Sequence, residues 1–165
     1  MTGATARISR SRAKNPAVKA PAASSLAVRR RMQATPQRDT PCELALRSAV
    51  HRLGLRFRID CRLPGMRRRA DIAFTVPRVA VFVDGCFWHG CPEHGTWPKA
   101  NAEWWRKKIQ ANQWRDADTD RRLAHRGWAV VRAWAHEDMR AVARKVARLV
   151  TRRTQPDSKS LKRPI

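Results

Sequence analysis

Apolar positions along the chain predict four strands, and the clearest is the uninterrupted run at residues 79–83. A short continuous run rich in β-branched residues is typical of a strand buried on both faces. Strict alternation at residues 55–59 predicts a half-exposed strand, and residues 70–74 and 128–134 predict two more. Three strands in a row before the next helix indicate a mixed sheet.

Apolar residues spaced three and four apart predict three helices. The first spans residues 41–53, with Thr40 as N-cap and Glu43 at the acidic position of a capping box. Asn101 is the expected N-cap of the second helix and Asp138 that of the third. The order of elements predicts one α/β domain, in which the second helix is a right-handed crossover between parallel strands.

One face of the second helix is polar in the middle of its apolar stripe. The residues that share this face by helical spacing are Trp105, Ile109, Asn112, Asp116, Thr119 and Leu123. Buried polar groups need partners. We therefore expect Asn112 and Asp116 to contact something specific, unless the face is misassigned.

The composition indicates an anionic partner. The 165 residues include 36 Lys and Arg against 13 Asp and Glu, a formal charge of +23. Such an excess attracts polyanions, so DNA or RNA is the first partner to consider and an anionic membrane surface the second. No apolar stretch approaches the roughly 20 residues of a spanning helix, and no signal-peptide core is present. We expect a cytoplasmic protein with no membrane partner, whose four cysteines are reduced thiols or metal ligands.

We expect one folded domain between two basic ends. Residues 1–28 have the composition of a disordered arm, which either binds phosphate or is a solvated tail of no specific use. Residues 29–151 make up the domain, of which 29–37 would order only on a partner. Residues 152–165 are predicted to be a loose basic tail. Nothing in the sequence requires a dimer, so we expect a monomer.

Candidate chemistry gathers behind the 79–83 strand, at Val-Asp-Gly-Cys-Phe-Trp-His-Gly-Cys-Pro-Glu-His in residues 83–94. Asp71 on the neighbouring strand is a candidate ligand for Mg²⁺, a cation that prefers carboxylate oxygen. Its alternative is an ion pair with one of the arginines at positions 67–69. His89 is a candidate general base, and Asp116 is placed to orient its ring. In a basic protein these residues indicate metal-dependent phosphodiester cleavage.

Four further residues predict a zinc site. Cys86, Cys91, His94 and His136 offer soft or borderline ligands, and a closed tetrahedral site would tie the long loop to the body of the domain. The alternatives are two buried thiols with two surface histidines, or a catalytic zinc.

Phe87 and Trp88 are predicted to contact DNA rather than the core. Neighbours in an extended segment face opposite sides, so both cannot point inward. Together with Trp105 they are candidates for stacking on bases or inserting between them, with core packing as the alternative. Glu43 also has two interpretations, because a helix-capping acid needs no catalytic role to explain it.

With these motifs the sequence resembles the very-short-patch mismatch repair endonucleases of bacteria. The resemblance covers about residues 32–149 and rests on Arg38-Asp39-Thr40, Glu43, Leu63-Pro64-Gly65, Ala70-Asp71-Ile72, residues 83–92, residues 104–109, Asn112, Arg115-Asp116 and Gly127-Trp128. It implies a restriction-endonuclease-like core of the PD-(D/E)xK type. It also implies an enzyme that nicks DNA on the 5′ side of the T in a T:G mismatch left by deamination of 5-methylcytosine.

The resemblance implies a role for each candidate residue. Asp71 and the backbone carbonyl of Val83 would bind Mg²⁺, His89 would activate water with Asp116 as its partner, and Glu43 would join the hydrogen-bond network of the active site. The residues implied to enter the DNA are Phe87, Trp88, Trp105 and, from the opposite groove, Met32. The residues implied to hold zinc are Cys86, Cys91, His94 and His136.

Two alternatives to a mismatch endonuclease stay open. One is a restriction-type endonuclease that shares the core but reads matched DNA, and the other is a non-catalytic, zinc-stabilised DNA-binding module. Double-stranded DNA with a T:G mismatch is the expected partner, with mismatch-repair proteins as further candidates. Asp84 has no assigned role.

Overall fold

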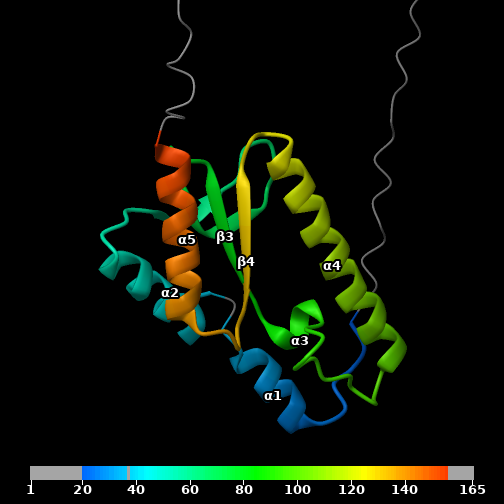
Figure 1. The fold of residues 1–165 in the computed structure, drawn as a ribbon. Coiled ribbons are helices and arrows are strands. Elements are labelled where there is room, and N and C mark those ends of the chain that lie inside the picture. Colours follow the sequence, from blue (N-terminus) through cyan, green and yellow to red (C-terminus); the bar gives the residue numbers. More distant parts are fainter. Residues whose placement is uncertain (1–19, 37, 156–165) are drawn as a thin grey trace, which may run out of the picture.

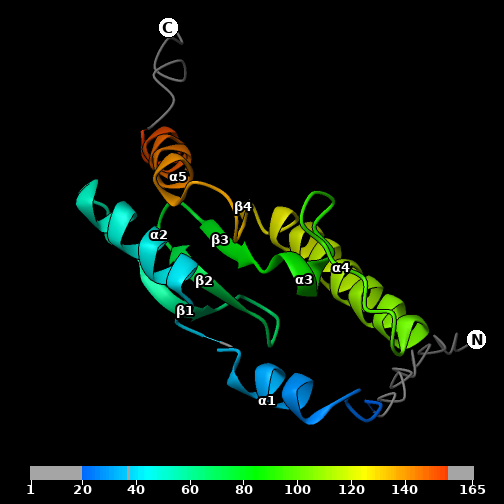
Figure 2. The ribbon, with the colours of Figure 1, turned by 90° about the horizontal axis from the view of Figure 1, so that it is seen from below.

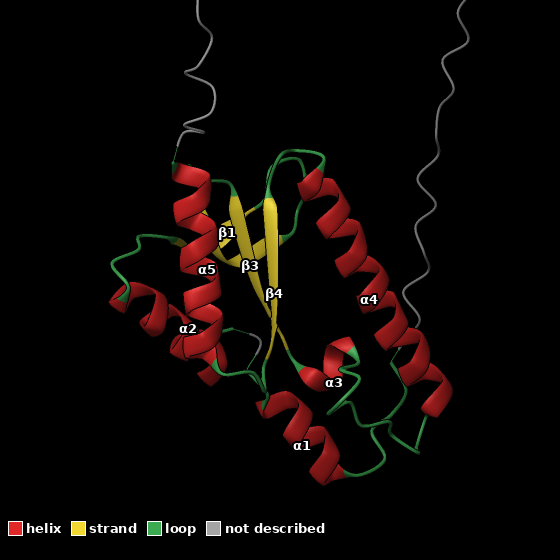
Figure 3. Cartoon of the chain, viewed as in Figure 1, coloured by secondary structure: helices red, strands yellow, loops and turns green. Residues whose placement is uncertain are grey.

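A computed structural model describes residues 20–36 and 38–155 of the chain, and in it a central sheet is flanked by helices on both faces (Figures 1 and 3). The helices are α1 (Leu26–Ala34), α2 (Pro41–Arg52), α3 (Cys86–His89), α4 (Ala102–Ala124) and α5 (Met139–Thr154). The strands are β1 (Arg58–Arg62), β2 (Arg69–Phe74), β3 (Val79–Asp84) and β4 (Ala129–Trp134). This mixed sheet with flanking helices fits the restriction-endonuclease-like core that the sequence predicts.

Strand β3 lies in the middle of the sheet, whose order is β1-β2-β3-β4. It pairs antiparallel with β2 and parallel with β4, in a register that runs from Val79 opposite Ala129 to Asp84 opposite Trp134. Helix α4 connects the two parallel strands, so the predicted crossover is confirmed. Burial of β3 on both faces is also confirmed, since only Val83 in this strand is more than slightly exposed.

Two apolar layers hold the sheet in place. On one face α2 and α5 pack together through Leu46, Val50, Val142 and Val146, all of which are buried. On the other face Leu123 of α4 packs in a smaller cluster that surrounds Ala80 and Phe82 of the sheet. Figure 2 shows the sheet between these two layers, with α3 on the α4 side.

The predicted N-cap of α2 is confirmed, and the acid reaches back one residue further than in a standard capping box. The Thr40 hydroxyl accepts from the Glu43 N–H at 3.3 Å, and Glu43 accepts from the N–H of Asp39, the residue before the N-cap, at 3.0 Å. Asp138 caps α5 as expected, because its side chain accepts from the Arg140 N–H. Asn101 is the N-cap residue of α4 as predicted, but its side chain does not cap the helix. It has a positive φ of 55° and makes no capping hydrogen bond, and its amide donates instead to the Ala22 carbonyl at 3.3 Å.

Several boundaries differ from those expected. Strand β1 begins at Arg58, three positions after the alternating run begins. Residues 29–37, which could order only on a partner by the sequence prediction, are helical as far as Ala34, because α1 begins after Ser25, an N-cap that accepts from Val28. The predicted arm and tail lie largely in residues 1–19 and 156–165, outside the described residues, and their described parts at 26–28 and 152–154 are helical. None of the helices described is long and apolar enough to cross a bilayer.

Candidate active site and metal centre

Asp71 on β2 carries a carboxylate without a cation partner. Its Oδ2 accepts a hydrogen bond from the backbone N–H of Val83 at 2.7 Å. No Lys, Arg or His among the described residues lies within ion-pair distance of it. Two of the three arginines offered as its alternative partners are engaged elsewhere, Arg68 with Asp118 and Arg69 with Asp60, and Arg67 is not in ion-pair contact with Asp71. An ion pair with a neighbouring arginine is therefore not the explanation of Asp71.

Burial makes ionisation of Asp71 unfavourable. It raises the pKa of this carboxyl from 3.8 to about 6, against the opposing effect of the hydrogen bond from Val83. The negative charges of Glu43 and Asp84 raise the pKa further. The charge of Arg47 lowers the pKa, but it acts more weakly than either carboxylate. Several carboxylates thus converge at Asp71 without a cation in ion-pair contact with it among the described residues, which is the electrostatic condition that favours binding of a divalent metal ion.

His89 ends the short helix α3 and contacts Asp116 of α4, as the polar positions on α4 predict. Its Nδ1 lies 2.6 Å from Oδ2 of Asp116. A carboxylate only accepts, so Nδ1 carries a proton, and in the neutral imidazole the free lone pair is then at Nε2. Burial opposes the charged form of Asp116, but the hydrogen bond from His89 and the charge of Arg132 outweigh it and lower the pKa of this carboxyl.

Helix α4 also fixes the position of α3. The Asn112 amide donates to the Trp88 carbonyl at 2.7 Å, and the Gln113 amide donates to the His89 carbonyl at 3.1 Å. These bonds satisfy carbonyls that the end of a one-turn helix leaves without partners. The expected specific partner of Asn112 is therefore the backbone of the segment that carries His89.

Gly90 is required where α3 ends. It has a φ of 65°, and a Cβ at this position would lie 2.7 Å from Cγ2 of Ile109 and 2.8 Å from Nε2 of Gln113. Conformation and close approach both favour glycine. Sequence reasoning missed this residue, although a glycine after a short run of helix-compatible residues is the usual sign of a helix end.

Glu43 lies in a buried network at the start of α2 and is 7% exposed. Besides its capping bonds, it pairs with Arg47 at 3.0 Å, and Arg47 also contacts Asp39. The charge of Glu43 reaches Asp71, where it contributes to the raised pKa. Both interpretations of Glu43 thus have a structural basis: it caps α2, and it shapes the field at Asp71.

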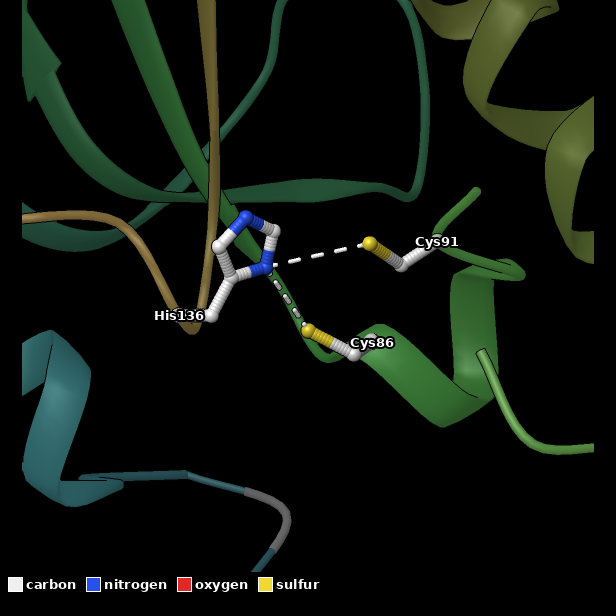
Figure 4. A group of neighbouring side chains, drawn as sticks. All are labelled: Cys86, Cys91 and His136. Carbon is white, nitrogen blue, oxygen red and sulfur yellow. Dashed lines mark hydrogen bonds between the residues drawn. The ribbon is translucent and has the colours of Figure 1, made fainter. Parts of the chain in front are cut away.

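Three of the four predicted zinc ligands converge (Figure 4). Nδ1 of His136, which follows β4, lies 3.2 Å from Sγ of Cys86 and 3.7 Å from Sγ of Cys91. Zinc–sulfur and zinc–nitrogen bonds at tetrahedral angles would separate such atoms by about 3.5 Å, so these residues fit the ion. His94 lies beside them, its ring 4.2 Å from that of His136 and its N–H donating to Cys91. The three converging residues can hold a metal, whereas His94, the fourth predicted ligand, has ligand atoms close to Glu93 and His136 but not to both cysteines.

The three predicted DNA-contacting aromatics form one cluster. Phe87 lies 5.2 Å from Trp88 and 5.0 Å from Trp105 between ring centroids, and the two tryptophans lie 5.7 Å apart. Trp105 is buried, whereas Phe87 and Trp88 are half-buried. The premise that residues 87 and 88 are extended is wrong, because they belong to one helical turn and both contact Trp105. Met32 lies on α1, is 37% exposed and is not part of the cluster.

Comparison with known proteins identifies the family. The family model described as DNA mismatch endonuclease Vsr matches residues 25–94. The Type II nicking enzyme V.NaeI of Lentzea aerocolonigenes is 45% identical over 113 residues, which cover 67% of this chain and 68% of the relative. The chain belongs to the Vsr endonuclease family. Further relatives are the Type II nicking enzyme V.XorIIP of Xanthomonas oryzae, 41% identical over 64% of this chain and 77% of the relative, and the DNA mismatch endonuclease Vsr of Escherichia coli, 37% identical over 62% and 65%.

Membership of the Vsr family makes the protein a DNA endonuclease, a hydrolase of phosphodiester bonds that acts on DNA. The alternative of a non-catalytic DNA-binding module is therefore rejected.

Proposed function

We propose that the protein nicks duplex DNA on the 5′ side of the T in T:G mismatches by Mg²⁺-dependent hydrolysis. The observation that carries this proposal is the His89–Asp116 pair in the same acidic site as Asp71, a carboxylate without a cation partner in the described structure. The description of the matching family, DNA mismatch endonuclease, supports the substrate.

In this proposal the metal site consists of Asp71 and the backbone carbonyl of Val83. A bound Mg²⁺ would supply Lewis-acid polarisation of the scissile phosphate. The N–H of Val83 orients the Asp71 carboxylate, and Glu43 adds negative charge that favours the ion.

His89 is proposed as the general base. Because its Nδ1 proton is held by Asp116, the lone pair at Nε2 can accept the proton of the attacking water. Asp116 would hold the ring in this tautomer and stabilise the imidazolium that forms. The side-chain amides of Asn112 and Gln113 would hold His89 at a fixed position relative to α4.

The zinc site is proposed to be structural. Cys86, Cys91 and His136, with His94 as fourth ligand, would leave no open coordination position. Burial, together with the neighbouring Cys91, raises the pKa of the Cys86 thiol, so zinc binding would have to displace its proton. Because Cys86 opens α3 and His136 follows β4, the ion would tie the helix that carries His89 to the sheet.

The aromatic cluster is proposed to insert into DNA beside the mismatch. Phe87 and Trp88 are half-buried and keep surface available for stacking, and Trp105 supports them from α4. Met32 on α1 would enter from the opposite groove. Figure 1 shows α1 and α3 at the same end of the molecule.

We propose that the protein acts as a monomer. Its proposed parts are a basic arm at residues 1–28, the endonuclease domain at 29–151 and a basic tail at 152–165. A nick in one strand needs only one active site. Mismatch-repair proteins are proposed as further partners. We propose that the protein acts in the bacterial cytoplasm with the chromosome; the printed name of the Escherichia coli relative, DNA mismatch endonuclease, supports this proposal.

A nicking assay tests the substrate and the metal together. A T:G duplex is compared with matched T:A and C:G duplexes, each with and without Mg²⁺, and we expect a nick only in the T:G duplex with Mg²⁺. Equal cleavage of matched duplex would instead support an enzyme that reads intact sequence. Asp71→Ala and His89→Ala should abolish nicking while leaving mismatch binding largely intact, and nicking by either variant at the wild-type rate contradicts the assigned mechanism.

A second experiment tests the aromatic cluster. Trp88→Ala should weaken binding to the T:G duplex more than to matched duplex, because base stacking contributes about 1 to 3 kcal/mol per base. The matched control is Trp114→Ala, since Trp114 is 70% exposed on α4 and lies outside the cluster. An equal loss of affinity for both duplexes in Trp88→Ala would count against insertion at the mismatch.

A further inference from the structure

A single arginine in strand β4 contacts three carboxylates beside the proposed base. Nη1 of Arg132 lies 2.9 Å from both oxygens of Asp84, and Nε lies 3.0 Å from Oδ2 of Asp120. Nη2 donates to Asp120 at 3.1 Å and lies 3.5 Å from Oδ1 of Asp116. The sequence analysis assigned no role to Arg132 or Asp84.

Two of these carboxylates also compete for His89. The ring Nδ1 is 2.6 Å from Oδ2 of Asp116 and 3.4 Å from Oδ1 of Asp84. One proton at Nδ1 therefore has two possible acceptors. Arg132 engages both oxygens of Asp84 but only the Oδ1 side of Asp116, so Oδ2 of Asp116 is the oxygen left for His89.

The side chain of Arg132 is restrained by its neighbours. Its Cζ lies 4.6 Å from the centroid of the Phe82 ring, and its side chain is only 22% exposed. Burial by itself would lower the pKa of the guanidinium, but the hydrogen bond to Asp120 and the charge of Asp84 outweigh it and raise this pKa above its ordinary value. Removal of the guanidinium would leave Asp84, with a side chain 9% exposed, as a buried charge without its cation.

We infer that Arg132 is a positioning residue for the nicking reaction: by holding Asp84 and Asp116 it makes Asp116 the partner of His89 and fixes the direction of the imidazole ring. This inference rests on the proposed function, in which His89 is the base. Asp84 then has a defined place as the second anchor of Arg132.

A different explanation is that Arg132 merely ties β4 to α4. Asp120 separates the two, because it contacts Arg132 from α4 but makes no contact with His89. If Arg132 had only this structural role, Asp120→Asn and Arg132→Met would have similar effects on the rate of nicking. A positioning role affects the chemical step only when the carboxylates beside His89 lose their cation.

The test is single-turnover nicking of a T:G duplex by the zinc-loaded, full-length protein. Arg132→Met keeps the length of the side chain and removes its charge, and we expect the rate constant at saturating enzyme to fall at least about tenfold with the affinity for DNA unchanged. Asp120→Asn should stay within about threefold of wild type. A wild-type rate in Arg132→Met, or equal losses in the two variants, overturns the inference.

Recovery by a second substitution sharpens the test. A neutral amide competes less strongly for the Nδ1 proton than a carboxylate does. Asp84→Asn introduced into Arg132→Met should therefore restore part of the lost rate, and Asp84→Asn alone completes the cycle. Failure of the double variant to exceed Arg132→Met contradicts the competition between the two acceptors. Should Arg132→Met not fold, as judged by its melting curve, Arg132→Gln, which also lacks the charge, takes its place with the same expected direction and recovery.

The ring nitrogens of His89 provide a direct readout. In ¹⁵N spectra the wild-type protein should show the proton at Nδ1, and Arg132→Met should change that signal while Asp120→Asn should not. His89→Ala separates this inference from the proposed function. If His89→Ala nicks normally, the function assigned to His89 fails; if it is inactive while Arg132→Met is normal, only the positioning inference fails.

Discussion

Replacing Asp71 with asparagine should stabilise the protein while abolishing its activity. In the folded chain this carboxylate is partly buried without an ion-pair partner among the described residues, and its pKa is raised to about 6. Asparagine has nearly the same shape, and its carbonyl oxygen can still accept from the Val83 N–H. The substitution therefore removes a partly buried charge and keeps the hydrogen bond.

The size of the effect follows from the pKa. A rise from 3.8 to about 6 is about two units, and each unit corresponds to about 1.4 kcal/mol. The folded chain binds the Asp71 proton more tightly than the unfolded chain does, so stability is lost as the pH rises from about 4 through about 6. We expect Asp71→Asn to gain at most about 3 kcal/mol near pH 7.5 and about 1 kcal/mol near pH 4.5.

Urea denaturation in Mg²⁺-free buffer at both pH values measures these gains. Added Mg²⁺ should then stabilise the wild-type protein and leave Asp71→Asn unchanged, because the variant lacks the ligand. The control is Asp118→Asn. Burial slightly opposes ionisation of Asp118, but hydrogen bonds from Arg122 and Arg68 lower its pKa, so this variant should gain nothing. A destabilised Asp71→Asn at neutral pH, or a gain that does not shrink on acidification, refutes the reasoning.

Three further substitutions test the metal centre and the fold. Cys91→Ser should release zinc and lower the melting temperature. Cys61→Ser should retain both, because the Cys61 thiol donates to the Arg62 carbonyl and is not among the converging metal ligands; metal analysis of the purified variants checks this. Leu46→Ala, at a fully buried position, should lower the free energy of unfolding by about 2 to 5 kcal/mol in urea titrations, and a smaller loss would contradict close packing there. Thr40→Ala should lower it by about 1 kcal/mol through loss of the cap on α2, and an unchanged midpoint would mean that the capping bonds contribute nothing.

The parts of the fold that could be predicted from the sequence are those with local signals. The apolar run of β3 identified a strand buried on both faces, and Thr40 with Glu43 identified the start of α2. Helical spacing placed Asn112 and Asp116 on the inner face of α4, and the need of buried polar groups for partners then led to contacts with α3. In each case the determining residues lie within a few positions of one another.

Helix α3 could not be predicted in the same way. Four residues are too few for a helical period, and the bonds that satisfy its last carbonyls come from Asn112 and Gln113 on another helix. The unpredicted helix also changes the interpretation of the site, because the expectation that Phe87 and Trp88 cannot both face the core holds only for an extended segment. The aromatic cluster that the structure shows instead depends on Trp105, which lies far along the chain.

Asp84 shows why a charged residue beside a candidate site cannot be interpreted from its neighbours in sequence. Its partner Arg132 interrupts an otherwise apolar strand, and only the parallel register of β3 and β4, with Phe82 opposite Arg132 and Asp84 opposite Trp134, brings the two charges together. Once paired, Asp84 accepts from Arg132 on both oxygens, and Asp116 is then the carboxylate that accepts from His89. The strand register thus determines which of two carboxylates serves the histidine, and a shift of β4 by one residue would turn the Arg132 side chain to the opposite face of the sheet and undo that choice.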